Sequence, residues 1–215
     1  MKKRVIILKH SITYYAYLFV VWGFYRLLFQ APVPFEELII KPIVWLAPLF
    51  IFLKKEKASV SSVGFLFNNL FKTAYFAIGL GFVFSFLALI VNYLKYKGFY
   101  FDNSFREVTF LGALLLSFIT AVSEELAFRG YLLSRLIEVI KNEWRAGLTV
   151  SLGWVLIHLP IAIFDWRIDF ISLLIYLAVI FLFSMGTTIV FLRTRNILAP
   201  ILLHVFWQWP IILYR

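Results

Sequence analysis

Cysteine is absent from this chain of 215 residues, and histidine occurs only three times. The lack of cysteine excludes disulfide bonds, thiolate metal sites and a cysteine nucleophile. Charged residues are also scarce, at 15% of the chain, and we find no low-complexity tract, long linker or internal repeat. The sequence therefore predicts a single domain over residues 1–215, in which any acid–base chemistry depends on a small set of side chains.

Apolar residues, in contrast, make up 63% of the chain, and the mean hydropathy is +0.91. Soluble domains have roughly 45 to 50% apolar residues, so the composition indicates a membrane protein. Apolar stretches of about the spanning length cover residues 12–29, 39–53, 73–94, 107–128, 147–164, 170–192 and 197–213. We therefore predict an all-α, polytopic transmembrane helix bundle of about seven spans (six to eight), with the lipid bilayer as a partner.

The basic residues give a formal net charge of +10 but lie scattered in the short links between apolar stretches. A nucleic-acid partner is not expected, because that function favours a basic patch on one polar face. The positive-inside rule places the N-terminus in the cytoplasm and Lys41 in an outer link. We expect a multi-pass protein of the plasma (cell) membrane, whose N-terminal basic run is a retained anchor because no cleavage site follows it.

Two further segments bear on the helix boundaries. Residues 54–69 form the longest inner link and are expected to be a loop. Residues 131–140 keep an amphipathic helical pattern, so we expect the fourth helix to emerge into the membrane interface there or to break at Gly130. Asn196 and Pro200 are expected to open the last helix, where proline is tolerated in a first turn.

Two adjacent carboxylates, Glu124 and Glu125, interrupt the fourth apolar stretch. An ionisable side chain in a spanning helix costs roughly 2.5 to 3.5 kcal/mol at the bilayer centre, so such residues usually mark function. Glu125 and Arg129 are spaced i,i+4, which predicts an ion pair on one helix face. Glu124 is turned by about 100° from that face, which makes it a candidate general base for water. The alternative is that both carboxylates only support a helix interface.

The spacing of this motif is not specific by itself. Glu36 and Glu37, followed by Lys41, have nearly the same arrangement in an apparent loop. Further groups are therefore needed before the carboxylate pair indicates a site.

Two of the three histidines lie inside predicted spans, whereas His10 lies among polar N-terminal residues and is expected to be solvated. Trp154 precedes His158 by four residues, and Gln208 follows His204 by four, so each helix presents two groups to one side. An interhelical hydrogen bond is an equally good explanation for an isolated membrane histidine. If the fourth span ends near residue 128, both histidines and Glu124 lie near the midplane or in the cytoplasmic half.

Taken together, the ordered motifs resemble those of the CPBP family of intramembrane endopeptidases, which includes the type II CAAX prenyl proteases and bacteriocin-processing enzymes. The resemblance covers about residues 110–209 and implies a catalytic-type core at about 106–213. The motifs that carry it are Glu124-Glu125-x-x-x-Arg129, Trp154-x-x-x-His158, and His204-x-x-x-Gln208 preceded by Asn196-Ile-Leu-Ala-Pro-Ile.

The resemblance implies a glutamic-type protease that acts on a membrane-associated protein or peptide. It implies that Glu124 is the base that activates water and that His158 assists it. It also implies that His204 and Gln208 bind the oxyanion. Glu125 and Arg129 would fix the helix and the charge of the site. The chain departs from the family pattern at Trp154, where phenylalanine is usual, and at Gln208, where asparagine is usual.

Three alternatives remain at the level of the sequence. No cofactor is expected, but Glu124, His158 and His204 also form a ligand set that zinc accepts. A catalytically inactive membrane scaffold, regulator or bacteriocin-immunity protein is consistent with Gln208. A small proton-coupled transporter is less consistent, because the halves of the chain carry no inverted repeat.

Overall fold

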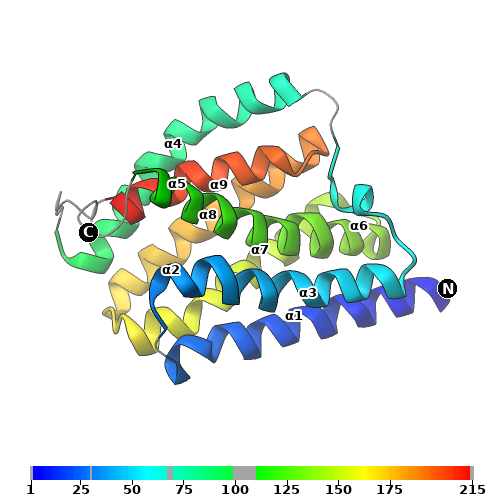
Figure 1. The fold of residues 1–215 in the computed structure, drawn as a ribbon, viewed down its shortest axis with the longest axis horizontal. Helices are drawn as coiled ribbons and strands as arrows, with labels where there is room; N and C mark the ends of the chain where they lie inside the picture. Colours follow the sequence, from blue (N-terminus) through cyan, green and yellow to red (C-terminus); the bar gives the residue numbers. More distant parts are fainter. Residues whose placement is uncertain (1, 30, 67–69, 99–109, 214–215) are drawn as a thin grey trace.

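The computed structural model describes residues 2–29, 31–66, 70–98 and 110–213 (Figure 1). These residues form a bundle of helices and contain no strand. The elements are α1 (Lys2–Leu28), α2 (Val33–Phe35), η1 (Glu36–Ile40), α3 (Lys41–Lys55), η2 (Val60–Val63), α4 (Leu70–Tyr96), α5 (Phe110–Glu125), η4 (Leu126–Leu133), α6 (Ser134–Ile140), α7 (Glu143–Pro160), η5 (Ile161–Asp165), α8 (Phe170–Thr194) and α9 (Leu198–Leu213). Each of the seven apolar stretches falls on a helix, although residues 107–109 of the fourth lie outside the described residues.

Several of these elements run on without a break and form long helices. α2, η1 and α3 make one helix over residues 33–55, and α5, η4 and α6 make another over residues 110–140. α7 continues directly into η5 and ends at residue 165. η1, η4 and η5 are π-helical. Such segments are rare inside α-helices and are often found at functional sites.

The helices are long and apolar enough for an integral membrane protein. In the described residues, five helical segments meet the length and hydropathy needed to cross a bilayer, namely Lys3–Tyr25, Thr73–Leu94, Leu111–Ile140, Glu143–Asp165 and Phe170–Thr194, and the apolar helix Leu198–Gln208 is shorter. The helix over residues 33–55 carries charged side chains near both of its ends, which lowers its mean hydropathy. The predicted all-α polytopic architecture is therefore confirmed.

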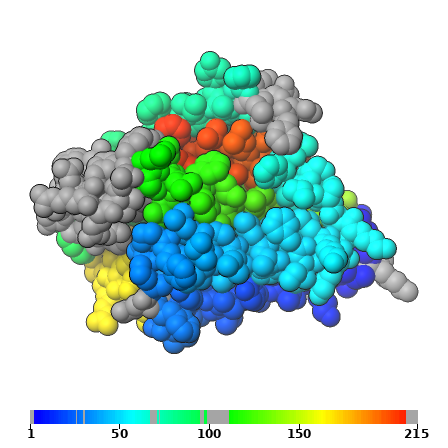
Figure 2. All heavy atoms as spheres, in the orientation of Figure 1, coloured from blue at the N-terminus to red at the C-terminus, as the bar shows by residue number. Residues whose placement is uncertain are grey.

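The packing places α9 between α4 and the rest of the bundle. α9 lies against α4, α5 and α8, while α1 and α3 run side by side at the opposite edge (Figure 1). In the space-filling view, α4 covers the outer side of α9 (Figure 2). Several large side chains of α4 are exposed, among them Phe71 at 85% and Tyr75 at 78%. Exposed apolar surface of this extent is expected where a helix faces lipid.

The fourth helix excludes one of the two sequence expectations. It does not break at Gly130 but continues to Ile140, and several residues after residue 128 are buried, including Arg129 and Arg135. Arg135 is accommodated because its guanidinium is paired with Glu56, 2.6 Å away, so its charge does not force the helix into water.

The link after α3 is more ordered than the expected loop. It forms the short 3₁₀ turn η2, which packs against η4, and a Cβ added to Gly130 would lie 3.0 Å from the Val63 carbonyl oxygen. Gly64 follows in the left-handed region at φ +83°, which glycine adopts at no steric cost. Its carbonyl accepts a bond of 2.9 Å from the Ile197 amide, so the link reaches the start of α9.

Side-chain caps fix where the later helices begin. The Asn196 carboxamide oxygen accepts a 2.9 Å bond from the Leu198 amide, as expected for the residue that opens α9. Asn142 and Asp169 cap α7 and α8 in the same way. The helices that carry His158 and His204 thus have defined starting points.

Candidate active site

A buried polar cluster joins three long helices in the middle of the bundle. We call it the central cluster and define it as Glu37, Lys41, Glu124, Glu125, Arg129 and His204. All six residues are buried. They come from the helix over residues 33–55, the helix over residues 110–140 and α9.

The predicted ion pair between Glu125 and Arg129 is present. A guanidinium nitrogen of Arg129 donates to Glu125 Oε1 at 3.2 Å, and both side chains are fully buried. His204 Nδ1 lies 2.7 Å from the same oxygen. Because a carboxylate oxygen only accepts, this geometry assigns the proton to Nδ1 and fixes the tautomer of a neutral His204 with Nε2 as an acceptor.

Arg129 is held by further contacts that keep its charge in place. Its guanidinium donates to the Ser184 hydroxyl at 2.7 Å and to the Ser184 carbonyl at 3.1 Å, which ties the fourth helix to α8. The guanidinium also lies 4.4 Å from the centre of the Trp154 ring. Arg129 therefore neutralises Glu125 and supports the aromatic wall of the cluster at the same time.

Trp154 links the two predicted histidines. Its ring centre lies 5.1 Å from that of His158 and 5.6 Å from that of His204, and Phe183 packs on His204 at 5.0 Å. His158 Nδ1 donates to the Trp154 carbonyl at 2.8 Å, because a carbonyl oxygen only accepts. His158 is thereby left with Nε2 as its available group.

Glu124 points away from Glu125, as the helical period predicts. Its Oε1 makes a close ion pair with the Lys41 ammonium, and its Oε2 lies 3.8 Å from His204 Nε2. The two carboxylates therefore have separate environments, one beside Arg129 and one beside Lys41. His204 faces both, with Nδ1 toward Glu125 and Nε2 toward Glu124.

Gln208 lies one helical turn after His204 on α9, and its side-chain oxygen is buried without a hydrogen-bond partner in the described part of the chain. The same is true of Glu125 Oε2 and Arg129 Nε. Buried polar atoms are rarely left unsatisfied, so their concentration here is unusual. Each predicted site residue is thus on α9, α7 or the fourth helix. Glu125 contacts Arg129 and His204, and Trp154 contacts the same two residues.

Comparison with known proteins agrees with this arrangement. Residues 106–210 match the family described as type II CAAX prenyl endopeptidase, Rce1-like. The match covers just under half of the chain. The resemblance to the CPBP endopeptidases is therefore confirmed, and at the level of the family the match supports an intramembrane protease. No curated protein and no solved structure matches the chain.

The Rce1-like domain contains the three predicted motifs but excludes two members of the central cluster. Glu37 and Lys41 come from the helix over residues 33–55. Glu37 was expected in a loop and Lys41 in an outer link. Lys41 Nζ donates to Glu37 Oε2 at 2.7 Å, and Thr120 of α5 donates to the same oxygen at 2.7 Å. The expectation of a loop was wrong, because residues 36–41 are helical and their buried side chains Glu37 and Lys41 pair with each other and with residues of the Rce1-like domain.

The signal for these residues was present in the sequence. Glu36-Glu37-x-x-x-Lys41 has the form of Glu124-Glu125-x-x-x-Arg129, and in both copies the second glutamate pairs with the cation four residues later. Lys41 of the first motif also pairs with Glu124 of the second, so the two motifs lie against each other. The first motif was expected to lie in a loop because a proline stands on either side of Val33, which is typical of loops.

The length of the fourth helix bears on the depth of the site. The candidate span runs from Leu111 to Ile140, so Glu124 lies about 20 Å from one end and about 24 Å from the other at 1.5 Å per residue. The helix thus continues beyond residue 128, where the fourth span was assumed to end. Glu124 is near the middle of this candidate span.

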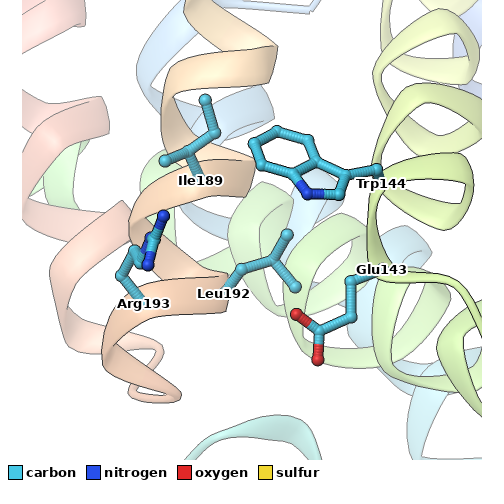
Figure 3. Close-up of a pocket in the computed structure, with 5 residues that line it drawn as sticks. All are labelled: Glu143, Trp144, Ile189, Leu192 and Arg193. Atoms are coloured by element: carbon cyan, nitrogen blue, oxygen red, sulfur yellow. The ribbon is translucent and has the colours of Figure 1, made fainter.

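No set of three or more histidine, aspartate or glutamate side chains in the described ranges is arranged to hold a metal ion. The zinc alternative for Glu124, His158 and His204 stays a prediction that only metal analysis tests. A cleft of about 180 Å³ lies elsewhere, between the start of α7 and the end of α8. Figure 3 shows Trp144 and Glu143 of α7 on one side of it and Leu192 and Arg193 of α8 on the other, and its lining contains no residue of the central cluster.

A second polar cluster lies nearer the end of the fourth helix. We call it the end cluster and define it as His10, Glu56, Ser62, Tyr131 and Arg135. Glu56 Oε1 accepts from the Tyr131 hydroxyl at 2.7 Å and lies 3.1 Å from His10 Nδ1, while Glu56 Oε2 accepts from Arg135 Nε at 2.6 Å. Arg135 also donates to the Ser62 hydroxyl at 3.1 Å. His10 is therefore half-buried and bonded, which corrects the expectation that it is solvated.

Proposed function

We propose that the protein is a glutamic-type intramembrane endopeptidase in which Glu124 activates a water molecule for hydrolysis of a peptide bond. The observation that supports this most directly is the 3.8 Å separation between Glu124 Oε2 and His204 Nε2 in a buried site. A polar gap of this length accommodates a bridging water. With His204 neutral, that water donates one hydrogen to each acceptor and keeps a lone pair for attack.

The reaction then balances with the groups present. The water oxygen attacks the carbonyl carbon of the peptide bond while its proton passes to Glu124 Oε2. When the tetrahedral intermediate collapses, the C–N bond breaks and Glu124 returns the proton to the leaving nitrogen. General acid–base catalysis of this kind contributes about 10² to 10⁴-fold.

The histidines and Gln208 would act on the charge that develops during the attack. The Gln208 amide N–H would bind the oxyanion, and His204 would donate from Nε2 once it has taken the second proton of the attacking water, its positive charge then being balanced by Glu125. That proton is released after the C–N bond breaks, because the new acid group leaves as a carboxylate. His158 would accept or return a proton through Nε2, since its Nδ1 is engaged by the Trp154 carbonyl. Glu125 and Arg129 would hold His204 in this orientation rather than take part in proton transfer.

The substrate class follows from the position of the site. A base near the middle of a spanning helix acts on a peptide that enters the membrane, so we propose a membrane-associated protein or peptide as substrate and the cell membrane as the location. A prenylated C-a-a-X tail, a bacteriocin leader and a sorting-signal tail are the three substrate chemistries to compare.

A direct test compares purified wild type with Glu124→Gln and His204→Ala on membrane-tethered peptides of these three kinds. Glu138→Gln is the matched control, because Glu138 lies on the same helix and pairs with Lys3 at 3.3 Å near the surface. We expect cleavage by wild type and by the control, and a loss of at least about 10²-fold in the other two. Equal cleavage by all four proteins, or by none, contradicts the proposal.

The strongest rival is an inactive membrane scaffold, regulator or immunity protein, and Gln208 is the observation that favours it. The longer amide displaces its donor relative to asparagine, and a displacement of about 1 Å costs on the order of 10²-fold. If Gln208→Asn alone confers cleavage, the natural protein is a scaffold with an impaired site. If wild type cleaves and retains its activity in strong chelator, both the scaffold and the zinc alternatives are excluded.

A further inference from the structure

The candidate base is already engaged by a residue outside the Rce1-like domain. Lys41 is 4% exposed, and its ammonium makes an ion pair with Glu124 Oε1. An ammonium of this kind is costly to bury unless it is paired and hydrogen-bonded. Glu124 and Lys41 therefore hold each other in the site.

The contacts around Lys41 restrict where its ammonium can lie. Glu37 Oε2 accepts from it at 2.7 Å, and Glu37 is itself fixed by the Thr120 hydroxyl on the same oxygen. The ammonium also lies 5.2 Å from the Trp22 ring centre and 5.9 Å from that of Trp45. Two carboxylates and two indole faces thus hold the ammonium at a defined point.

This arrangement distinguishes the two oxygens of Glu124. Oε1 is bound by Lys41, whereas Oε2 faces His204 Nε2 across 3.8 Å. Of the two cations in the cluster, Arg129 pairs with Glu125 and Lys41 pairs with Glu124. A carboxylate held by one oxygen cannot rotate freely, so its second oxygen keeps a fixed direction.

We propose that Lys41 is a positioning residue for the reaction, which holds Glu124 through Oε1 so that Oε2 faces the water between Glu124 and His204. The proposal rests on the proposed function and extends the site beyond residues 106–210 to the helix over residues 33–55. Lys41 itself does not touch the reacting atoms, and Glu37 and Thr120 support it from behind. The Rce1-like domain alone would then lack a part of the machinery.

The first experiment separates the charge of Lys41 from its volume. Lys41→Met keeps most of the volume without the ammonium, and Lys41→Arg keeps the charge. Lys54→Met is the control, since Lys54 lies exposed on the same helix. We expect Lys41→Met to lower kcat by about 10²-fold at nearly unchanged KM, with Lys41→Arg within about tenfold of wild type. Equal kcat in Lys41→Met and wild type overturns the proposal.

A second variant guards against a loss of folding. Lys41→Ala leaves a space that propylammonium fills, with 1-propanol as the neutral molecule of similar size. Recovery of kcat by propylammonium and not by propanol supports a positioning charge. Equal recovery by both, or recovery by neither in a protein that unfolds like wild type, shows that Lys41 only fills space and overturns the proposal.

The pairing is also measured without a substrate, so its failure is distinguishable from that of the proposed function. Unfolding of Lys41→Met, Glu124→Gln and the double variant forms a mutant cycle. We expect each single variant to be less stable than wild type and the double variant to regain part of the loss, because Glu124→Gln removes the carboxylate charge that Lys41→Met alone leaves without this cation. If no form cleaves any peptide, the proposed function fails, and additive losses in the cycle overturn the role of Lys41 in holding Glu124.

Discussion

The central cluster and the end cluster both link the fourth helix to the helix over residues 33–55 or to the turn that follows it, but they differ in how fully their polar atoms are bonded. Each contains a buried carboxylate that pairs with an arginine, Glu125 with Arg129 and Glu56 with Arg135. In the end cluster both oxygens of Glu56 are bonded. In the central cluster Glu125 Oε2 and Arg129 Nε have no hydrogen-bond partner within the described residues.

This difference shows how a polar group that stabilises a membrane bundle is told apart from one placed for chemistry. A fully bonded network rigidifies the fold and has nothing left to offer a substrate. A cluster with unsatisfied atoms carries a cost that packing alone does not explain. Among the described residues, such atoms include those of Glu125 and Arg129 in the central cluster, of Gln208, and of Trp45, whose ring centre lies 5.9 Å from the Lys41 ammonium. Their position favours the central cluster as the site and the end cluster as a structural connection.

The largest effect on stability is expected from breaking the central ion pair. Arg129→Met leaves Glu125 charged and buried without its cation, and the loss of one partner of a buried pair costs about 3 to 5 kcal/mol. Unfolding in mixed micelles, followed by tryptophan fluorescence, measures this change. Arg145→Met, which removes an exposed arginine from α7, is the control. A loss in Arg129→Met no greater than in the control would mean that the pair carries no net stability.

A smaller effect, confined to stability, is expected in the end cluster. Glu56→Gln weakens its bond to Arg135 and the contacts with Tyr131 and His10, which we expect to lower the free energy of unfolding by about 1 to 3 kcal/mol. Cleavage by the folded protein should stay at the wild-type level. A drop in kcat as large as that in Glu124→Gln would erase the distinction between the clusters.

Close packing between η2 and η4 gives a third, more modest prediction. Gly130→Ala places a methyl group 3.0 Å from the Val63 carbonyl oxygen, so the η2 turn must move outward. We expect a loss of about 1 kcal/mol in unfolding free energy. Gly79→Ala is the matched control, because nothing lies within 4 Å of the added carbon there. Equal stability of the two variants would indicate that η2 yields without cost.

The smallest effect is expected at an exposed ion pair, where burial is absent. Hydrogen bonds from Ser172, together with Lys97, hold the pKa of Asp169 well below its usual range. The stabilisation is therefore present above the ordinary pKa of about 4 and is lost as the pH falls through the lowered one. Melting temperatures of wild type and Asp169→Asn should differ slightly near pH 6 and converge in strong acid. A difference that grows on acidification would contradict this sign.

Much of the fold could be predicted because apolar length alone determines a spanning helix. Within the described residues each of the seven apolar stretches falls on a helix, and the Glu125–Arg129 pair follows from i,i+4 spacing. The end of the fourth helix could not be predicted, since Arg129 and Arg135 read as interfacial charges until their partners are known. Those partners, Ser184 and Glu56, lie far away in the sequence.

The contribution of Lys41 to the site was hidden for a related reason. Its contact with Glu124 joins segments that are 83 residues apart, and no local pattern specifies such a pairing. The repeated Glu-Glu-x-x-x-cation spacing pointed to it, but the adjacent Pro32 and Pro34 favoured a loop. Residues 36–41 are instead helical, because the first turn of a helix tolerates proline.

The π-helical segment Glu36–Ile40 lets one helix change the direction that it faces. After it, the buried side chains of α3 recur every fourth residue, at Lys41, Trp45, Leu49 and Leu53. Each wide turn holds one residue more than an α-helical frame, which rotates everything beyond it by about 100°. Without this shift in phase, Glu37 and the Lys41 stripe would have a different relative orientation. The extra residue in this turn thus sets whether the carboxylates Glu36 and Glu37 lie on the side of the helix that faces Glu124 and Glu125.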